Sequence, residues 1–306
     1  MDCNHASSTA ILLGACYLAD MTMLLADSNA LGNPDLRAYL AASRDHHIAL
    51  SDLTLVEMRK EHPIANSRMS LRIASRFPSQ IFVLKRTHEI LNLNIAASGD
   101  ADALFDHMAG AELDQDLMDL VTVPVPGRLK DRMAALEIEA INVIFELSKQ
   151  MQGLEEALVD MTKEFKPDQV KQLRTGQDVT EETRHTLFRL LKETTARFFV
   201  DNQQPLNRKG ILLTEARGMF AFRYSLCMMI YYILWVQNGR QVGRAQHLRV
   251  NDVIDMQLAA IGTYFNGILS TDRLVRNTSH TVRAVLRQFG AFVAEDWIVP
   301  NSLASR

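Results

Sequence analysis

The hydrophobic periodicity of this chain changes twice along its length, which limits the folds open to it. Up to about residue 86, short apolar runs typical of buried strands alternate with amphipathic helices. Across residues 87–250 the apolar side chains recur at helical spacing with almost no strand pattern, over a length that suits a domain. Strand–helix alternation resumes at residue 251. The sequence therefore predicts an α/β fold whose parallel sheet is interrupted by a large all-α insertion.

The first part of the chain places acids at or soon after the ends of predicted strands. Asp27 follows the first apolar run directly, and Glu57 falls in the first two turns of the helix after the second. Open parallel sheets bind ligands beyond the carboxyl ends of their strands, so both acids are expected at one edge. The predicted strands are 23–26, 47–50 and 80–84.

The last part repeats this pattern with one helix and one strand. Asn251 is the expected N-cap of the helix, and Asp255 lies at the edge of its apolar face, where an acid needs an explanation. After a turn at Asn266-Gly267, residues 268–269 form the predicted strand, and Asp272 lies just beyond it. Asp255 and Asp272 are therefore expected at the same sheet edge.

Four acids at comparable places favour a metal site. A single Asp after a strand is more often a turn or cap residue, but the ordered set is much harder to explain in that way. Carboxylates that converge repel each other, and hard divalent cations such as Mg²⁺ or Mn²⁺ hold them together. Such ions activate water and neutralise the charge that builds on a phosphodiester during hydrolysis.

The same ordered set resembles the PIN-domain nucleases. Asp27-Ser-Asn29 is similar to the opening motif of the family, and residues 50–57 are similar to its second segment. Residues 251–255, followed by Ser270-Thr-Asp272, resemble the third and fourth segments. The resemblance implies a PIN-like core, a parallel-sheet sandwich, that is divided between residues 20–86 and 251–300. It leaves the helical insertion domain at 87–250 unexplained.

The resemblance also implies roles for individual residues. The metal ligands and catalytic acids would be Asp27, Glu57, Asp255 and Asp272, with Asp255 favoured over Asp252 by helical spacing. Asn29 would orient the first carboxylate, and Thr271 would help to place the last. Cations that flank the motifs are expected to contact substrate phosphates: Arg59, Lys60, Lys85, Arg86, Arg273 and Arg276.

Residues 205–249 are a second candidate for nucleic-acid contact. They carry seven basic residues with aromatic residues interleaved, against the single acid Glu215. Aromatic residues at this density are more often core, whereas a surface role and a structural role are equally open for the cations. The basic residues are Arg208, Lys209, Arg217, Arg223, Arg240, Arg244 and Arg249.

Composition and targeting signals exclude several other classes. The net charge of −3 does not indicate a nucleic-acid binder, so any basic surface must be local. The cysteines Cys3, Cys16 and Cys227 show no zinc spacing and fit a reducing compartment. The most apolar run, 224–236, is too short to span a bilayer, and no basic segment marks a signal peptide. A cytoplasmic protein without a membrane contact is expected.

The predicted function is therefore that of a Mg²⁺- or Mn²⁺-dependent endoribonuclease. Metal-activated water would attack a phosphodiester of single-stranded RNA at the four-carboxylate site, without a covalent intermediate. A toxin or defence role rests on analogy with the family alone. One alternative is a DNA or flap-type nuclease of the same fold. The other is a non-enzymatic interaction protein with a vestigial acid cluster, and in either case the insertion could bind a regulatory partner or a second copy.

Overall fold

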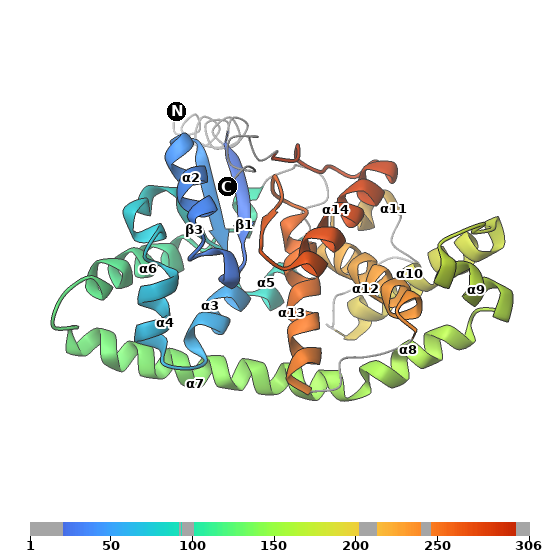
Figure 1. Cartoon of the computed structure of the whole chain (residues 1–306), viewed down its shortest axis with the longest axis horizontal. Helices are drawn as coiled ribbons and strands as arrows, with labels where there is room; N and C mark the ends of the chain where they lie inside the picture. Colours follow the sequence, from blue (N-terminus) through green and yellow to red (C-terminus); the bar gives the residue numbers. More distant parts are fainter. Residues whose placement is uncertain (1–20, 92, 94–100, 202–212, 240–245, 298–306) are drawn as a thin grey trace, which may run out of the picture.

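The fold is mixed α/β and mostly helical, built around a four-stranded, all-parallel sheet (Figure 1). A computed structural model describes residues 21–91, 93, 101–201, 213–239 and 246–297. The α/β class and the parallel sheet predicted from the sequence are confirmed. The strands are β1 (Thr22–Ala26), β2 (His46–Leu50), β3 (Ile81–Val83) and β4 (Ile268–Leu269), in the spatial order β3-β2-β1-β4.

The strand register aligns the carboxyl ends of all four strands. Ala26 of β1 pairs with Leu50 of β2 and with Leu269 of β4, and Leu50 pairs with Val83 of β3. The chain builds β2 and β3 on one side of β1 and then returns to its other side with β4. Such a reversal of strand order opens a crevice at the carboxyl ends of the two flanking strands, where open α/β sheets bind ligands. Here the reversal of strand order falls between β1 and β4.

Two helices near the start of the described chain begin at capping side chains. Asn33 caps α2 by accepting a hydrogen bond from the Asp35 backbone N–H, and Ser51 caps α3 in the same way through Thr54. The remaining α-helices run in chain order after these two. The bounds are α2 (Pro34–Ala42), α3 (Asp52–Arg59), α4 (Pro63–Ser70), α5 (Thr87–Leu91), α6 (His107–Leu120), α7 (Gly127–Gln150), α8 (Leu154–Lys163), α9 (Pro167–Thr175), α10 (Glu181–Asp201), α11 (Leu213–Ala216), α12 (Phe220–Gln237), α13 (Gln246–Gly262) and α14 (Arg273–Gln288).

Asn251 is not a helix cap, and that expectation was wrong. Helix α13 begins five residues earlier, at Gln246, so Asn251 lies inside it. The early part of α13 rests on α7, where Val250 and Asn251 line a groove with α7 side chains. An Asn followed by an Asp therefore did not mark the start of this helix.

The two faces of the sheet bury separate hydrophobic cores. Met23 and Leu25 of β1 enter the core that includes α12 and α13, whereas Leu24 and Ala26 enter the core with α2 and α6. The first of these cores joins sheet residues, the helices of 87–250 and the helices after residue 250 in one continuous cluster. The hydrophobic core therefore does not divide at residues 86 and 250.

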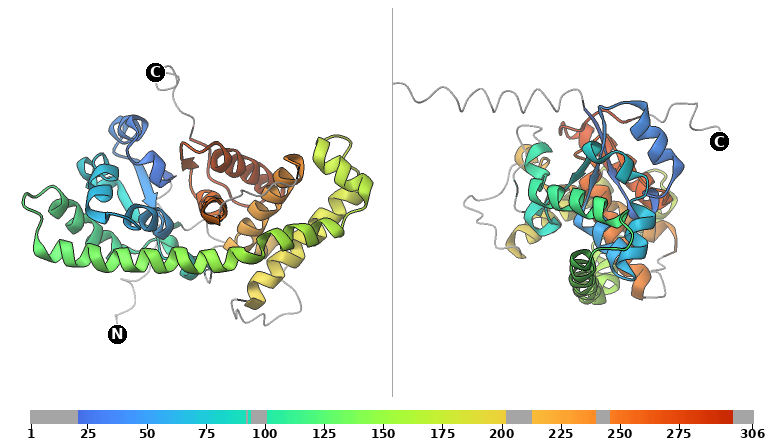
Figure 2. Two further views of the ribbon diagram at one scale, coloured as in Figure 1. Left: turned by 60° about the horizontal axis from the view of Figure 1, so that its bottom comes forward. Right: turned by 90° about the vertical axis from the view of Figure 1, so that its left-hand side faces the viewer.

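Helix α7 joins the two cores. Leu129 and Met133 near its start belong to the core with α2 and α6, and Leu147 near its end belongs to the core with α12. In Figure 1 this helix runs along the bottom of the molecule beneath α3, α4 and α13. The left view of Figure 2, in which the bottom of the molecule is turned forward, shows it crossing much of the width of the molecule. The two helices that carry Glu57 and Asp255 thus share one support.

None of the helices in the described segments combines the length and the hydropathy needed to cross a bilayer. The most apolar one, α12, buries most of its side chains in the protein core, including Tyr232 and Cys227. The other two cysteines, Cys3 and Cys16, lie outside the described residues.

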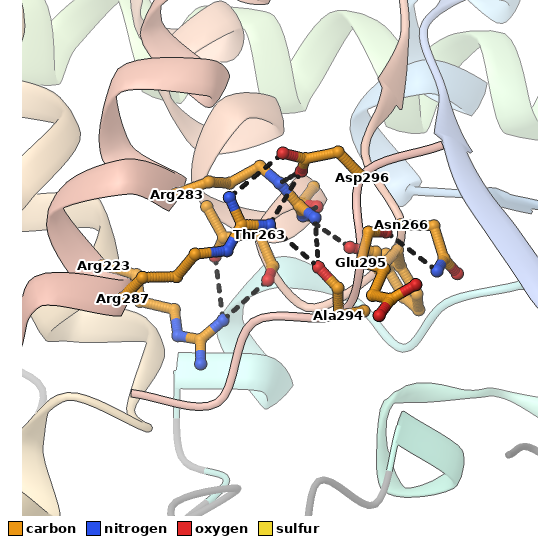
Figure 3. Close-up of polar contacts among 10 residues, drawn as sticks. Arg223, Thr263, Asn266, Arg283, Arg287, Ala294, Glu295 and Asp296 are labelled. Carbon is orange, nitrogen blue, oxygen red and sulfur yellow. Dashed lines mark hydrogen bonds and ion pairs between the residues drawn. The ribbon is translucent and has the colours of Figure 1, made fainter. Parts of the chain in front are cut away.

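Two buried arginines fasten the segment after α14 to the helical core (Figure 3). Arg223 of α12 is 2% exposed, donates to the carbonyl oxygens of Thr263 and Phe292 at 3.0 Å each, and stacks on the Tyr264 ring at 3.9 Å. Arg283 of α14, also 2% exposed, donates to the carbonyl oxygens of Gly262, Phe265 and Ala294 and pairs with Asp296. These contacts replace the hydration that each buried guanidinium loses.

The Arg283→Met variant should lose on the order of 3 kcal/mol of unfolding free energy, because it removes a buried donor to three carbonyl oxygens and one of the two arginines that pair with Asp296. Arg287→Met is the matched control. Arg287 also pairs with Asp296, but its side chain is 40% exposed, so its loss should cost about 1 kcal/mol or less. Urea denaturation measures both, and equal losses would contradict a structural role specific to Arg283.

Candidate functional site

Asp27 is the fixed point of the site. It follows β1 with extended backbone, is 2% exposed, and donates its N–H to the Leu269 carbonyl at 2.9 Å. Its Oδ2 accepts hydrogen bonds from Asn29 Nδ2 at 2.7 Å and from Ser270 Oγ at 2.6 Å. Asn29 thus contacts Asp27 as the family resemblance implies. Strands β1 and β4 are tied together through this carboxylate.

Asp272 caps α14 and is positioned from the same cluster. Its Oδ1 accepts from the backbone N–H groups of Leu274 at 2.6 Å and Val275 at 3.2 Å, while its own N–H donates to Ser270 Oγ at 3.0 Å. Thr271 contributes through its backbone, which donates to Asn29 Oδ1 at 2.8 Å. The hydroxyl that contacts both Asp27 and the Asp272 backbone is that of Ser270, two residues before the acid.

Glu57 joins the cluster from α3 through Ser28. The Ser28 hydroxyl donates a short hydrogen bond to Glu57 Oε2 and lies 3.4 Å from Asp27 Oδ1, so it stands between the two carboxylates. Burial raises the pKa of Glu57, and the charge of Asp27 raises it further against the opposing effect of the Ser28 hydrogen bond. Ser28 was not among the expected site residues, although it directly follows Asp27.

Asp255 faces the other acids from α13. Its pKa is raised to about 8, first by burial and then by the charges of Asp272, Asp27 and Glu57. No hydrogen bond from a described residue reaches its carboxylate. The structure therefore brings the four predicted acids into one electrostatically coupled cluster.

Asp252 contributes a fifth carboxylate at the margin of this cluster. It accepts a hydrogen bond from the Tyr231 hydroxyl at 2.7 Å, which holds it against α12. Burial raises its pKa, and the charge of Asp272 adds to this. Helical spacing ranked Asp255 above Asp252. The charges of all the other acids raise the pKa of Asp255, whereas only that of Asp272 raises the pKa of Asp252.

The carboxylate oxygens of the cluster are ligands that suit Mg²⁺ or Mn²⁺, but the acids stand too far apart to coordinate one ion together. Oxygen ligands from carboxylates are those that both ions prefer, and Asp255 has no described hydrogen bond to compete with a cation. In the described part of the chain, however, no three His, Cys, Asp or Glu side chains are arranged closely enough to hold a metal ion. Binding would require the carboxylates to draw together.

Three of the predicted phosphate contacts border the cluster. Lys60 ends α3 close enough to Glu57 to lower the pKa of that carboxyl against its burial. Arg276 donates to the Ser270 carbonyl oxygen at 2.9 Å and remains exposed, and Arg273 is exposed directly after Asp272. These three cations therefore lie beside the acid cluster.

The other three make contacts away from the acids. Arg59 lies among charges of α6 and α7, where burial lowers its pKa and Asp116 opposes this. Lys85 donates to the Ala103 carbonyl at 2.9 Å, and Arg86 pairs with Glu139 of α7 at 2.9 Å. The sequence placed these residues beside the motif acids, but their side chains point toward the helical part.

Two basic side chains of the segment 205–249 lie within the described residues, and both donate hydrogen bonds to backbone carbonyl oxygens. Arg223 is buried as described above, and Arg217 donates to the Phe289 carbonyl at 2.6 Å. The aromatic residues Phe220, Phe222, Tyr224, Tyr231, Tyr232 and Trp235 are all buried. Arg208, Lys209, Arg240 and Arg244 lie outside the described residues, as does the side chain of Arg249.

No protein-family model, curated protein or solved structure matches this chain. The PIN-like resemblance therefore rests on the motif residues themselves.

In EDTA, Asp255→Asn should stabilise the protein increasingly as the pH rises from about 5 to about 9. The folded-state pKa of Asp255 lies at about 8, above the ordinary value of about 3.9, so the wild type loses stability as pH rises between these values. The amide carries no charge and avoids this loss, which should reach about 2 kcal/mol or more at the upper end. Urea denaturation across this range measures the difference, and parallel profiles for the two proteins would contradict it.

Proposed function

We propose that this chain is a metal-dependent endoribonuclease with a PIN-like core. The observation that carries the proposal is the hydrogen-bonded junction of Asp27, Asn29 and Ser270 at the carboxyl ends of β1 and β4. This junction brings Asp272 and Asp27, which are far apart in sequence, to the sheet edge at which open parallel sheets bind ligands. The sequential order of the acids and the order of the strands both support it.

Within this proposal each acid has a defined role. Asp27 is held rigidly by two donors to one oxygen, and Asp272 by two backbone N–H groups, so both present fixed carboxylates. Asp255 and Glu57 face them from helices and complete an anionic, partly buried donor set. Mg²⁺ or Mn²⁺ bound there would neutralise the charge that develops on the phosphodiester. Lys60, Arg273 and Arg276 would contact neighbouring phosphates.

Single-stranded RNA is the proposed substrate, on the strength of the resemblance. DNA would meet the same acids and cations, so a DNA nuclease is tested alongside it. A defence or toxin role follows from analogy alone.

A non-enzymatic role is the second candidate, and one observation favours it. The described acids are not close enough together to coordinate a metal ion, whereas the ligands of a working metal site surround the ion during catalysis. In that case the acid cluster would be a remnant, and the helical part would serve to bind a partner.

Purified protein with Mn²⁺ should cut single-stranded RNA, and Asp27→Asn and Asp255→Ala should each lower the rate by on the order of 100-fold or more, because each removes a charged donor from the site. EDTA should abolish cleavage. Glu61→Gln is the matched control, since Glu61 is an exposed acid just beyond α3 and its loss should leave the rate unchanged.

Thermal denaturation gives a readout independent of cleavage. Mn²⁺ should raise the melting temperature of the wild type and of Glu61→Gln but not of Asp255→Ala. Intact RNA and DNA in every reaction, together with no metal-dependent stabilisation, would favour the interaction protein over the enzyme.

A further inference from the structure

A groove of about 430 Å³ opens between α7 and the two helices that carry Glu57 and Asp255. Lys60 at the end of α3, Phe145 and Lys149 of α7 and Asn251 of α13 line it, and none of the described residues in its lining is acidic. Two of its residues adjoin the acid cluster, because Lys60 acts on the charge of Glu57 and Asn251 precedes Asp252. The groove therefore lies beside the parts of α3 and α13 that carry Glu57 and Asp252.

The α7 wall of this groove exposes a ring and a cation together. Phe145 is 57% exposed, and the Lys149 Nζ lies 4.4 Å from the centre of its ring. Lys149 also pairs with Glu146 at 2.8 Å, but both side chains are more than half exposed, so this pair is weak and exchangeable. An exposed aromatic ring can stack on a base of a single-stranded nucleic acid, and a neighbouring lysine can bind its backbone phosphates.

We propose that this groove binds the single-stranded nucleic acid on its way to the acid cluster, with a base stacked on Phe145 and backbone phosphates held by Lys149 and Lys60. The proposal rests on the nuclease function proposed above and assigns to α7 a part in substrate binding. Charge complementarity supports this occupant, since the groove presents two cations and no described acid in its lining. Its position supports the same occupant, because a strand cut at the acids must enter or leave along one of the surfaces that border them.

Fluorescence anisotropy of full-length protein in EDTA tests the groove without cleavage, using labelled single strands of RNA and of DNA of about 12 nucleotides. Phe145→Ala should weaken binding at least about fivefold, as expected for one lost stacking contact. Lys149→Glu should weaken binding more and should reduce the slope of log affinity against log salt by about 0.7, the value for one phosphate of a single strand.

Each groove variant has a matched control. Lys163→Glu breaks a similar exposed pair, since Lys163 pairs with Asp160 at 2.7 Å with the same i,i+3 spacing, but it lies on α8 away from the groove. Ile138→Ala removes an equally exposed apolar side chain of α7, 63% exposed, that does not line the groove. Both controls should bind as the wild type does. Circular dichroism melting of all four variants checks that each is folded.

A parallel Mn²⁺ cleavage assay separates this proposal from the proposed function. If the wild type cuts while both groove variants bind and cut as their controls do, the groove proposal is overturned and the nuclease stands. If the wild type neither binds nor cuts RNA or DNA, both are overturned. Weaker binding by both groove variants, with wild-type binding by the controls, supports the groove proposal. The labelled strand that binds with higher affinity then shows whether the groove prefers RNA or DNA.

Discussion

The pairing of β1 with β4 is the interaction on which the rest of the site depends. Strand β4 has only two residues, yet backbone hydrogen bonds from Leu25 to Gly267 and from Asp27 to Leu269 fix it beside β1. Asn266 strengthens the pairing, because its side chain accepts from the Met23 N–H at 2.8 Å and its N–H donates to the Met23 carbonyl at 2.8 Å. A short strand held at both ends in this way gives a precise position to the residues that follow it, and those are Ser270 and Asp272.

Helix α7 supplies the second constraint, since it sets where the helices with Glu57 and Asp255 stand relative to each other. Both α3 and α13 rest on it, and its two ends enter different hydrophobic cores. Because a packed interior resists small displacements, movement of α7 would be transmitted to both acids. Helix α7, which belongs to the segment between residues 87 and 250, therefore supports both helices that carry these acids.

Charge is distributed unevenly between the structural and the candidate functional regions. The buried guanidinium groups of Arg223 and Arg283 are satisfied mainly by carbonyl oxygens and fasten the end of the chain to the helical core. The acid cluster has no comparable buried cation among the described residues, and the pKa of Asp255 rises to about 8 through burial and the neighbouring acids. Carboxylates held together without compensation store electrostatic repulsion, and binding of a cation would relieve it.

The sequence by itself determined the four strands, the sheet edge at which Asp27 and Asp272 stand, and the identity of the clustered acids. These follow from local periodicity and from the rule that parallel strands share one carboxyl edge, and both can be read along the chain. Only the tertiary structure decided that Ser28 and Ser270 connect the acids, that Arg59 turns toward α6 and α7, and that α13 begins at Gln246. Those features depend on which surfaces meet across long sequence separations, and a one-dimensional pattern of polar and apolar residues carries no record of such meetings.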